Sequence, residues 1–278
     1  MKNLKTMQKL FSALLMSILL FQCNTANKEI KVESNQELSS PKGKTLLVVL
    51  AHPDDELTVA SILAKYVAEG AKVHLVIATD GRYGTNDGEY EAGDELAAMR
   101  KKEMQCSADI LGVELTHLNY QDQLRSAEGY DGHIPHVRAL IKEVYELFGK
   151  IQPDAIITFG PEGWSNHMDH RLVGATVTQV FVSKIWDKSP SLYYVGRPSD
   201  LLDDPETKII RGQDKSYLTT RVTYTDDQKD QALRALSCHI TQMGEGALER
   251  MRKRNDNREK VVFLRKFVAP TETEDSVF

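Results

Sequence analysis

One stretch decides the fold of this chain: residues 46–56, LLVVLAHPDDE. Its first six residues are apolar without alternation, which is typical of a strand buried on both faces in a parallel sheet. Pro53 suits the first turn of a following helix, because its missing N–H is no loss there. The polar end of the stretch should therefore lie at the carboxyl end of a central strand, where open α/β sheets bind ligands. Three adjacent carboxylates repel one another unless a cation or protons neutralise them, so the stretch indicates a divalent metal site with a spare carboxylate.

Outward from this stretch, apolar runs alternate with helical patterns. The helical spacing is clearest in the third pattern, where Val137, Leu140, Ile141 and Val144 fall on one face. Strands are expected at 45–51, 72–79, 114–118 and 154–160, and more weakly at 191–195, 216–224 and 260–268. Helices are expected at 56–69, 94–111, 136–149 and 169–185. This alternation predicts βαβ units and an α/β fold with a mainly parallel sheet.

The first residues have the pattern of an export signal. Residues 1–22 combine lysines with an apolar run that is too short for an ordinary membrane span. Cys23 follows directly, which resembles a bacterial lipoprotein signal, although Gln22 stands where a small residue is common. The alternative is an ordinary secretory signal cut nearby. We expect an exported protein, held at the cell envelope by lipid on Cys23 or otherwise periplasmic or secreted.

The remaining chain divides by composition. Residues 23–44 are polar and resemble a flexible tether, residues 45–270 form one domain without an internal linker, and residues 271–278 form a loose tail. The whole chain has 35 basic and 40 acidic residues; without Lys2, Lys5 and Lys9, 32 basic residues remain and the net charge is −8. This acidic balance argues against nucleic acid as a partner. The oligomeric state does not follow from the sequence.

The cysteines do not form a recognisable framework. Cys23, Cys106 and Cys238 are too few for a zinc quartet or a disulfide scaffold. Cys106 and Cys238 are most simply small core residues, and a single bridge between them is the open alternative.

A strand followed by a turn and a helix also begins a dinucleotide-binding site. Such a site needs G-x-G-x-x-G, so that the backbone can approach a pyrophosphate. The turn at residues 52–56 has no glycine and carries three acids, which would repel phosphate. The dinucleotide hypothesis is therefore rejected.

A second polar cluster, residues 160–170 with the sequence GPEGWSNHMDH, follows the apolar strand expected at 154–160. If both strands belong to one parallel sheet, both clusters open on the same edge. The residues that would converge there are His52, Asp55, His167 and His170, with Asp54 and Asp169 alongside. Such nitrogen and oxygen donors suit a catalytic zinc site, which takes three protein ligands and keeps one position open. The simpler alternative is a solvated histidine together with acids that stabilise a helix N-terminus.

The motifs at residues 51–56 and 167–170 resemble the paired signatures of the LmbE-like, or PIG-L, N-acetylglucosaminyl deacetylase superfamily. Their order, separation and strand contexts match, and the resemblance covers about residues 45–245. It implies a Rossmann-like, three-layer α/β/α fold and a bound metal, usually zinc, although another divalent ion would serve the same chemistry.

The resemblance also implies roles for individual residues. His52, Asp55 and His170 would be the metal ligands, and Asp54 would be the general base. His167 would be the acid or electrophilic partner at the substrate carbonyl, with Asp169 fixing its ring. Met168 replaces a proline often found in the family, and its place between functional residues puts little in doubt.

Weaker features of the family occur elsewhere. Arg100 and Glu103 match an R-x-x-E pair, and Asp122 stands at a family Asp-Gly in which Gln123 replaces the glycine. His239 and Gln242 match a late H-x-[ST]-Q segment, and Trp164 could stack on a sugar face. The residues predicted to bind substrate are thus Arg100, Asp122, Trp164, His239 and Gln242. For each of them a structural role is the alternative: a surface salt bridge, a packed helix end or a loop anchor.

These observations predict a zinc-dependent hydrolase that removes the N-acetyl group of an amino sugar or glycoconjugate. One alternative keeps the metal chemistry but cuts a different amide, such as a thiol conjugate. Another is a non-catalytic carbohydrate-binding protein, which the complete set of ligands together with Asp54 and His167 argues against. The substrate itself has no readable code in the loops.

Overall fold

The computed structural model describes residues 40–86, 88–244, 246–256, 259–273 and 275–276. The predicted leader 1–22 and residues 23–39 of the predicted tether lie outside the described residues. The end of the tether packs on the domain, since the Gly43 N–H donates to the Gly70 carbonyl at 3.0 Å. Within the described part of the chain, the helices lack the combination of length and hydrophobicity that a bilayer crossing requires.

The described residues form a mixed sheet of seven strands in the order β3-β2-β1-β4-β5-β7-β6. Five strands run parallel, and β7 and β6 complete the sheet in antiparallel pairing. The strands are β1 (Thr45–Leu50), β2 (Lys72–Thr79), β3 (Glu114–Tyr120), β4 (Ala155–Thr158), β5 (Ser191–Val195), β6 (Thr220–Thr223) and β7 (Val261–Lys266). This confirms the predicted, mainly parallel sheet.

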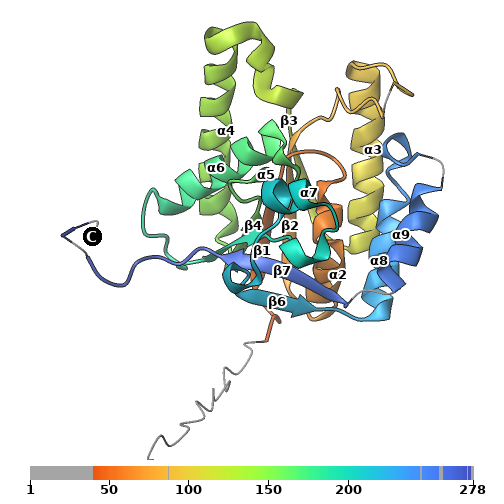
Figure 1. Ribbon diagram of the computed structural model, residues 1–278. Coiled ribbons are helices and arrows are strands. Elements are labelled where there is room, and N and C mark those ends of the chain that lie inside the picture. The colour runs from red at the N-terminus through yellow and green to blue at the C-terminus, as the bar shows by residue number, and fades with distance from the viewer. Residues whose placement is uncertain (1–39, 87, 245, 257–258, 274, 277–278) are drawn as a thin grey trace, which may run out of the picture. The chain divides into compact units, whose positions relative to one another are not determined.

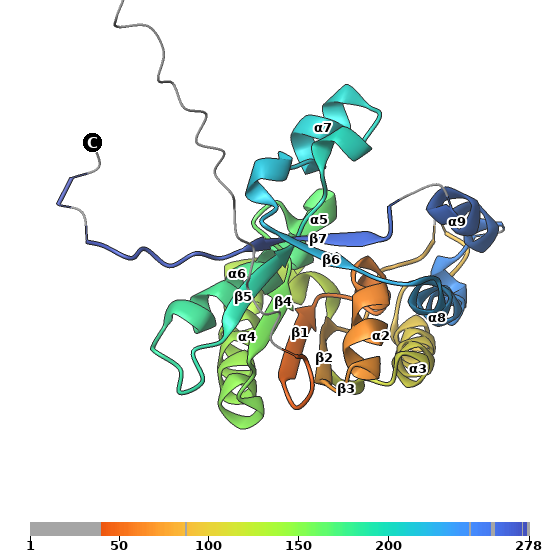
Figure 2. The ribbon, with the colours of Figure 1, turned by 90° about the horizontal axis from the view of Figure 1, so that it is seen from below.

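Helices cover both faces of the sheet. Figure 2 shows α2, α3 and α8 on one side and α4 and α6 on the other, and α2 and α3 both contact α8, whereas α4 contacts α6. The helices are α2 (Ala60–Ala68), α3 (Asp94–Leu111), α4 (Gly129–Ile151), α5 (Gly163–Asn166), α6 (Met168–Val182), α7 (Pro205–Arg211), α8 (Asp226–Leu236) and α9 (Ala247–Asp256). The three-layer α/β/α arrangement is therefore confirmed.

Strand β1 lies at the centre of this arrangement. Its residues Leu47, Val48, Val49 and Leu50 have no exposed surface, as expected for a run of apolar residues covered by helices on both faces. The chain moves outward from β1 to β2 and β3 and then crosses back to β4 on the other side of β1. The carboxyl ends of β1 and β4 thus flank the point where the strand order reverses, which is the usual place for a ligand site.

Several boundaries differ from the predictions. The helix expected at 56–69 begins only at Ala60, because Asp54 has a φ of 114° and a separate 3-10 turn occupies Asp55–Thr58. The helix expected at 136–149 spans Gly129–Ile151 and contains Pro135 in its interior. Helices α5, α7, α8 and α9 were not predicted, because they are short or rely on packing rather than on a strong apolar period.

The prediction that Cys106 and Cys238 are separate small core residues was wrong. The two residues form a disulfide, with their Cα atoms 5.9 Å apart, between α3 and the segment that follows α8. Cys238 is buried whereas Cys106 lies on the exposed side of α3, and α3 and α8 pack against each other. Their packing brings together two residues that are 132 positions apart in the sequence.

Candidate metal-binding and catalytic site

The turn after β1 is built on the Asp55 carboxylate. Its Oδ2 accepts hydrogen bonds from the backbone N–H groups of His52, at 2.7 Å, and Ala51, at 3.1 Å. Neighbouring strands hold the end of β1, since Thr79 and Thr158 donate their hydroxyls to the carbonyls of Ala51 and Val49. The turn is therefore a rigid, buried platform that points His52 and Asp55 out of the sheet edge.

The turn after β4 carries the second group of donors. It includes the short helix α5, and α6 then begins at Met168 with His167 as its N-cap, whose Nδ1 accepts the Asp169 N–H at 3.2 Å. The His170 ring stacks on the Phe159 ring, with centroids 4.2 Å apart and planes 10° apart. His170 is thus held in one orientation and faces the β1 turn.

The two turns bring three ligand atoms together, as the sequence predicts for His52, Asp55 and His170. His170 Nε2 lies 3.0 Å from Asp55 Oδ1 and 3.2 Å from His52 Nδ1, and His52 Nδ1 lies 3.4 Å from Asp55 Oδ2. Ligands bound tetrahedrally to zinc at about 2.0–2.2 Å lie about 3.3–3.6 Å from one another. The two histidine nitrogens thus lie close enough to share one divalent cation, and each of them faces a different oxygen of Asp55.

The outer nitrogens of both histidines have acceptors that fix the ring protons. His52 Nε2 lies 3.0 Å from Asp169 Oδ2, and His170 Nδ1 lies 3.0 Å from the Gly163 carbonyl. With N–H groups donating to these oxygens, His52 Nδ1 and His170 Nε2 keep their lone pairs for a cation. This is the usual arrangement around histidine ligands, in which a carboxylate or carbonyl orients the ring from behind.

In the described part of the chain, two groups of three donors have ligand atoms that all lie within 4.8 Å of one another. One consists of His52, His167 and His170, and the other of His52, Asp122 and Asp169. We prefer the set with Asp55, because His167 is 46% exposed. Both oxygens of Asp122 accept backbone N–H groups, whereas the backbone N–H groups bound by Asp55 share Oδ2, and its Oδ1 faces His170.

The electrostatics of the site favour a bound cation. Burial disfavours charge on His52, but its contacts with Asp169 and Asp55 outweigh this and raise the pKa of His52 to about 10. Burial likewise opposes ionisation of Asp55, yet hydrogen bonds from His170 and His52 hold the pKa of Asp55 well below its usual range. The carboxylates that favour a proton on His52 would equally attract a divalent cation.

Asp54 lies beside this group but points elsewhere. Its φ of 114° turns its carboxylate toward Arg100, whose Nη2 lies 3.0 Å from Asp54 Oδ2. Burial raises the pKa of Asp54 to about 6, and the positive charge of Arg100 opposes that rise. A carboxylate with a raised pKa next to a metal position is suited to accept a proton near neutral pH.

His167 is the accessible member of the group. Its ring meets the His52 ring edge-on, with the centroids 4.6 Å apart. Burial and the nearby charge of His52 lower the pKa of His167. Asp169 was predicted to fix the His167 ring. Its Oδ2 lies 4.0 Å from His167 Nδ1 but 3.0 Å from His52 Nε2, so its side chain orients His52 more directly than His167.

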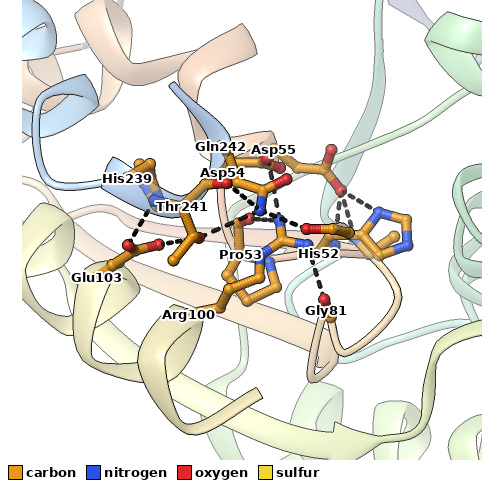
Figure 3. A network of polar contacts seen from close by, with 12 residues as sticks. His52, Pro53, Asp54, Asp55, Gly81, Arg100, Glu103, His239, Thr241 and Gln242 are labelled. Atoms are coloured by element: carbon orange, nitrogen blue, oxygen red, sulfur yellow. Dashed lines mark hydrogen bonds and ion pairs between the residues drawn. The ribbon is translucent and has the colours of Figure 1, made fainter. Parts of the chain in front are cut away.

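Arg100 is buried and engaged rather than free. It donates to the carbonyls of Pro53 and Gly81 and pairs with Asp54, as Figure 3 shows. The guanidinium fits closely between Gly81 and Gly84, where an added Cβ would lie within 2.7 Å and 2.2 Å of Arg100 atoms. In this geometry Arg100 holds the Asp54 turn, and its contact with substrate stays a prediction.

The remaining predicted substrate residues form the walls of the site. Asp122 is buried and accepts the N–H groups of Gly81 and Tyr83, so it shapes the loop after β2. Gln242 donates to the Gly84 carbonyl at 2.8 Å. His239 is fully buried on Glu56, behind the turn rather than at its surface. Direct substrate contacts of these residues stay predictions.

Trp164 stands at the edge of a separate cavity. Its ring lies under the Arg197 guanidinium at 4.2 Å, and both residues line a cavity of about 490 Å³. The cavity reaches Leu57 and Thr58, which follow Asp55 and Glu56 in the same 3-10 turn. This space lies next to the turns that carry the donor atoms.

Sequence reasoning gave Glu56 only a general supporting place and did not identify Ser107 at all. Glu56 Oε1 accepts hydrogen bonds from Ser107 Oγ at 2.6 Å and His239 Nε2 at 2.7 Å. Burying a carboxylate costs free energy unless the carboxylate is paired. An acid such as Glu56, at the start of a helix expected to be buried, therefore indicates partners from distant parts of the sequence.

Residues 47–181, which include both turns, match the PIG-L family, described as GlcNAc-PI de-N-acetylase. Residues 47–181 form a PIG-L domain. The predicted resemblance to this superfamily is thereby confirmed. The chain is 35% identical over 143 residues to the 1D-myo-inositol 2-acetamido-2-deoxy-alpha-D-glucopyranoside deacetylase of Corynebacterium glutamicum, covering 46% of this chain and 49% of the relative.

Two further comparisons extend this result. The diacetylchitobiose deacetylase of Thermococcus kodakarensis is 33% identical over 135 residues, which cover 47% of this chain and 46% of the relative. The alignments therefore span about half the length of these curated relatives. The N,N'-diacetylchitobiose deacetylase structure from Pyrococcus horikoshii has a TM-score of 0.59 at 22% identity, over 96% of this chain and 95% of that one. That likeness shows a shared fold.

Proposed function

We propose that this protein is a metal-dependent deacetylase that hydrolyses the N-acetyl group of an amino sugar or glycoconjugate. The observation that carries the proposal is the meeting of His52 Nδ1, His170 Nε2 and Asp55 within 3.0–3.4 Å, with Asp54 and His167 alongside. The names of the family and of two curated relatives support an N-acetylated amino sugar as the substrate class.

His52, Asp55 and His170 would hold the cation, which we propose to be zinc. When bound, it supplies a Lewis acid and lowers the pKa of a water molecule to near neutrality. The chain itself orients these ligands through Asp169 and the Gly163 carbonyl. With three protein ligands, such a metal would keep a position for water and substrate.

Asp54 and His167 would move the protons. Water adds its oxygen to the acetyl carbon while the Asp54 carboxylate takes its proton. The C–N bond then breaks as the amine nitrogen receives a proton from His167, and acetate and the free amino sugar leave. His167 is exposed enough to reach a substrate, and during the reaction its N–H can stabilise the charge that develops on the carbonyl oxygen.

A second candidate function keeps this chemistry but cuts a different amide. The cavity of about 490 Å³ beside Trp164 supports it, because apolar residues contribute much of its wall. A pocket of this size suits an acyl chain or an apolar group attached to the sugar. The two candidates differ in the acid that is released.

The test is a release assay on the full chain. Metal-depleted protein receives Zn²⁺ and is incubated with N-acetylated amino sugars and a panel of other amides, and the liberated acids are identified. We expect acetate from at least one amino sugar and no acid from the Asp54→Asn variant, since asparagine tolerates a positive φ but does not accept the proton. If the zinc-loaded chain binds amino sugars and hydrolyses no amide, the protein is a carbohydrate-binding protein instead.

We propose further that the protein is exported and anchored by lipid on Cys23, which lies outside the described residues. The Cys106–Cys238 disulfide supports export, because disulfides persist in oxidising compartments. Mass spectrometry of the protein from membranes of a host that lipidates its own lipoproteins tests the anchor. An N-terminal peptide that begins beyond Cys23 or lacks lipid would exclude it.

A further inference from the structure

The buried Glu56 carboxylate connects the catalytic turn to a disulfide. Glu56 and His239 have no exposed surface, and Glu56 Oε1 accepts hydrogen bonds from both Ser107 and His239. Glu56 Oε2 accepts the backbone N–H of Asp54 at 3.1 Å. One side chain thus joins two distant donors to the backbone of the proposed general base.

Both donors are sequence neighbours of the disulfide. Ser107 follows Cys106 in α3, and His239 follows Cys238 after α8. The bridge therefore fixes the distance between the two segments whose side chains meet on Glu56.

The segment after Cys238 has further anchors, visible in Figure 3. Thr241 donates its N–H and its hydroxyl to the Glu103 carboxylate at 2.8 and 2.7 Å. Gln242 donates to the Gly84 carbonyl, in the loop that encloses Arg100. These contacts place the segment against both supports of the Asp54 turn, Glu56 and Arg100.

Asp54 needs such supports because of its backbone. A φ of 114° with a ψ of −19° is rarely adopted by a residue with a side chain, and it persists only where the surroundings enforce it. The contacts that enforce it are the bond from the Asp54 N–H to Glu56 and the pair of its carboxylate with Arg100. If the first contact is lost, the turn can relax toward a commoner conformation and the carboxylate moves.

We propose that Glu56 is a positioning residue that holds Asp54 in its catalytic conformation, and that the Cys106–Cys238 disulfide maintains this contact through Ser107 and His239. The proposal rests on the proposed function in so far as Asp54 is the proton acceptor. The contact itself can be measured without any substrate.

The first test compares Glu56→Leu with Glu56→Gln in the full chain. Leucine offers no acceptor to the Asp54 N–H, whereas glutamine keeps an amide oxygen that can turn toward it. We expect Glu56→Leu to lower kcat about 10- to 100-fold, as for other residues that orient a metal site from behind. KM and the metal content per chain should stay near those of the wild type, and Glu56→Gln should restore most of kcat.

Thr178→Val is the matched control for lost stability. It removes the hydroxyl contacts of Thr178 with the Gly174 carbonyl in α6 and with the Tyr194 hydroxyl in β5. If the loss in Glu56→Leu came from general destabilisation, Thr178→Val at a similar unfolding temperature would lose as much kcat. Equal losses in the two variants, or a wild-type kcat in Glu56→Leu, would overturn the proposal.

The second test replaces both cysteines, as Cys106→Ser with Cys238→Ser. We expect a smaller loss of kcat than in Glu56→Leu, together with faster amide hydrogen exchange at residues 238–242 and at Asp54. Exchange in β1 should stay slow. Unchanged exchange at Asp54 in the double variant would show that the disulfide does not maintain the contact.

Hydrogen exchange also separates this proposal from the proposed function. If the wild type hydrolyses no amide, the proposed function fails, but faster exchange at Asp54 in Glu56→Leu would still support the contact. If the wild type is an active deacetylase and exchange at Asp54 is the same in all variants, only the positioning role is lost.

Discussion

The turn after β1 and the turn after β4 lie at the same edge of the sheet, but they differ in exposure. In the first turn, His52 and Asp55 are 9% and 7% exposed, and Glu56 is fully buried. In the second, the His167 side chain is 46% exposed and Met168 is 43% exposed, although Asp169 and His170 beside them are buried. The first turn is therefore buried and fixed in place, and the second turn contributes the residues that a substrate can reach.

Substitutions in the buried turn after β1 should have the largest effect on activity. In Asp55→Asn, the NH₂ group must face either the N–H groups of Ala51 and His52 or the His170 ring. One of these two sets of contacts is therefore lost. We expect the metal content per chain to fall well below one, and activity to fall about 10³-fold, because about 4 kcal/mol of Lewis-acid stabilisation disappears. Elemental analysis beside the release assay measures both. A fully metallated Asp55→Asn protein would remove Asp55 from the ligand set.

The exposed side should affect turnover without affecting the metal. His167→Asn keeps a side chain that can cap α6 but removes the proton donor. We expect kcat to fall about 10²- to 10⁴-fold, the usual range for a general acid, with metal content and unfolding temperature unchanged. Loss of metal in this variant would instead favour the group formed by His52, His167 and His170.

The packing between the two turns can be altered by one methyl group. A Cβ at Gly174 of α6 would lie 2.2 Å from the Phe159 carbonyl, so Gly174→Ala should push α6 away from the β4 turn. We expect the free energy of unfolding to fall by about 1–3 kcal/mol, measured by urea denaturation.

Gly149→Ala is the control for this packing variant. Gly149 also lies in a helix, α4, but an added Cβ would meet nothing within 4 Å. This variant should gain about 0.5–1 kcal/mol, because alanine favours helix more than glycine does. If Gly174→Ala gained stability as well, the close approach of α6 to Phe159 would be excluded.

The smallest effect is expected at Met168. It occupies the first position of α6, after a His167 with φ −62° and ψ 139°, a backbone that accepts a following proline. Met168→Pro should change the free energy of unfolding by no more than about 0.5 kcal/mol and leave kcat at the wild-type value. A large loss of either would mean that the exposed turn depends on a Met168 contact.

The parts of the fold that sequence predicts well are those set by local pattern. The strands ending before His52 and before Gly160 follow from mainly apolar runs, and parallel pairing then brings their polar ends together. Helix α3 matches its predicted range of 94–111 because its last residue precedes Gly112, which adopts a left-handed conformation.

The parts that sequence did not predict depend on contacts between distant residues. The bond between Glu56 and His239 joins residues 183 positions apart, and the Cys106–Cys238 bridge follows from the packing of α3 on α8. No local period signals such pairs. Helix α4 continues through Pro135 for a related reason, since its packing on the sheet and on α6 is not visible in the propensity of one residue.

The most direct test of the account is the position of the metal. Crystals of the zinc-loaded full chain, with diffraction recorded on both sides of the zinc absorption edge, would locate the ion by its anomalous signal. We predict one peak at about 2.0–2.2 Å from His52 Nδ1, His170 Nε2 and an Asp55 oxygen. A peak held by His52, Asp122 and Asp169, or the absence of any peak at the two turns in zinc-loaded crystals, would contradict the account.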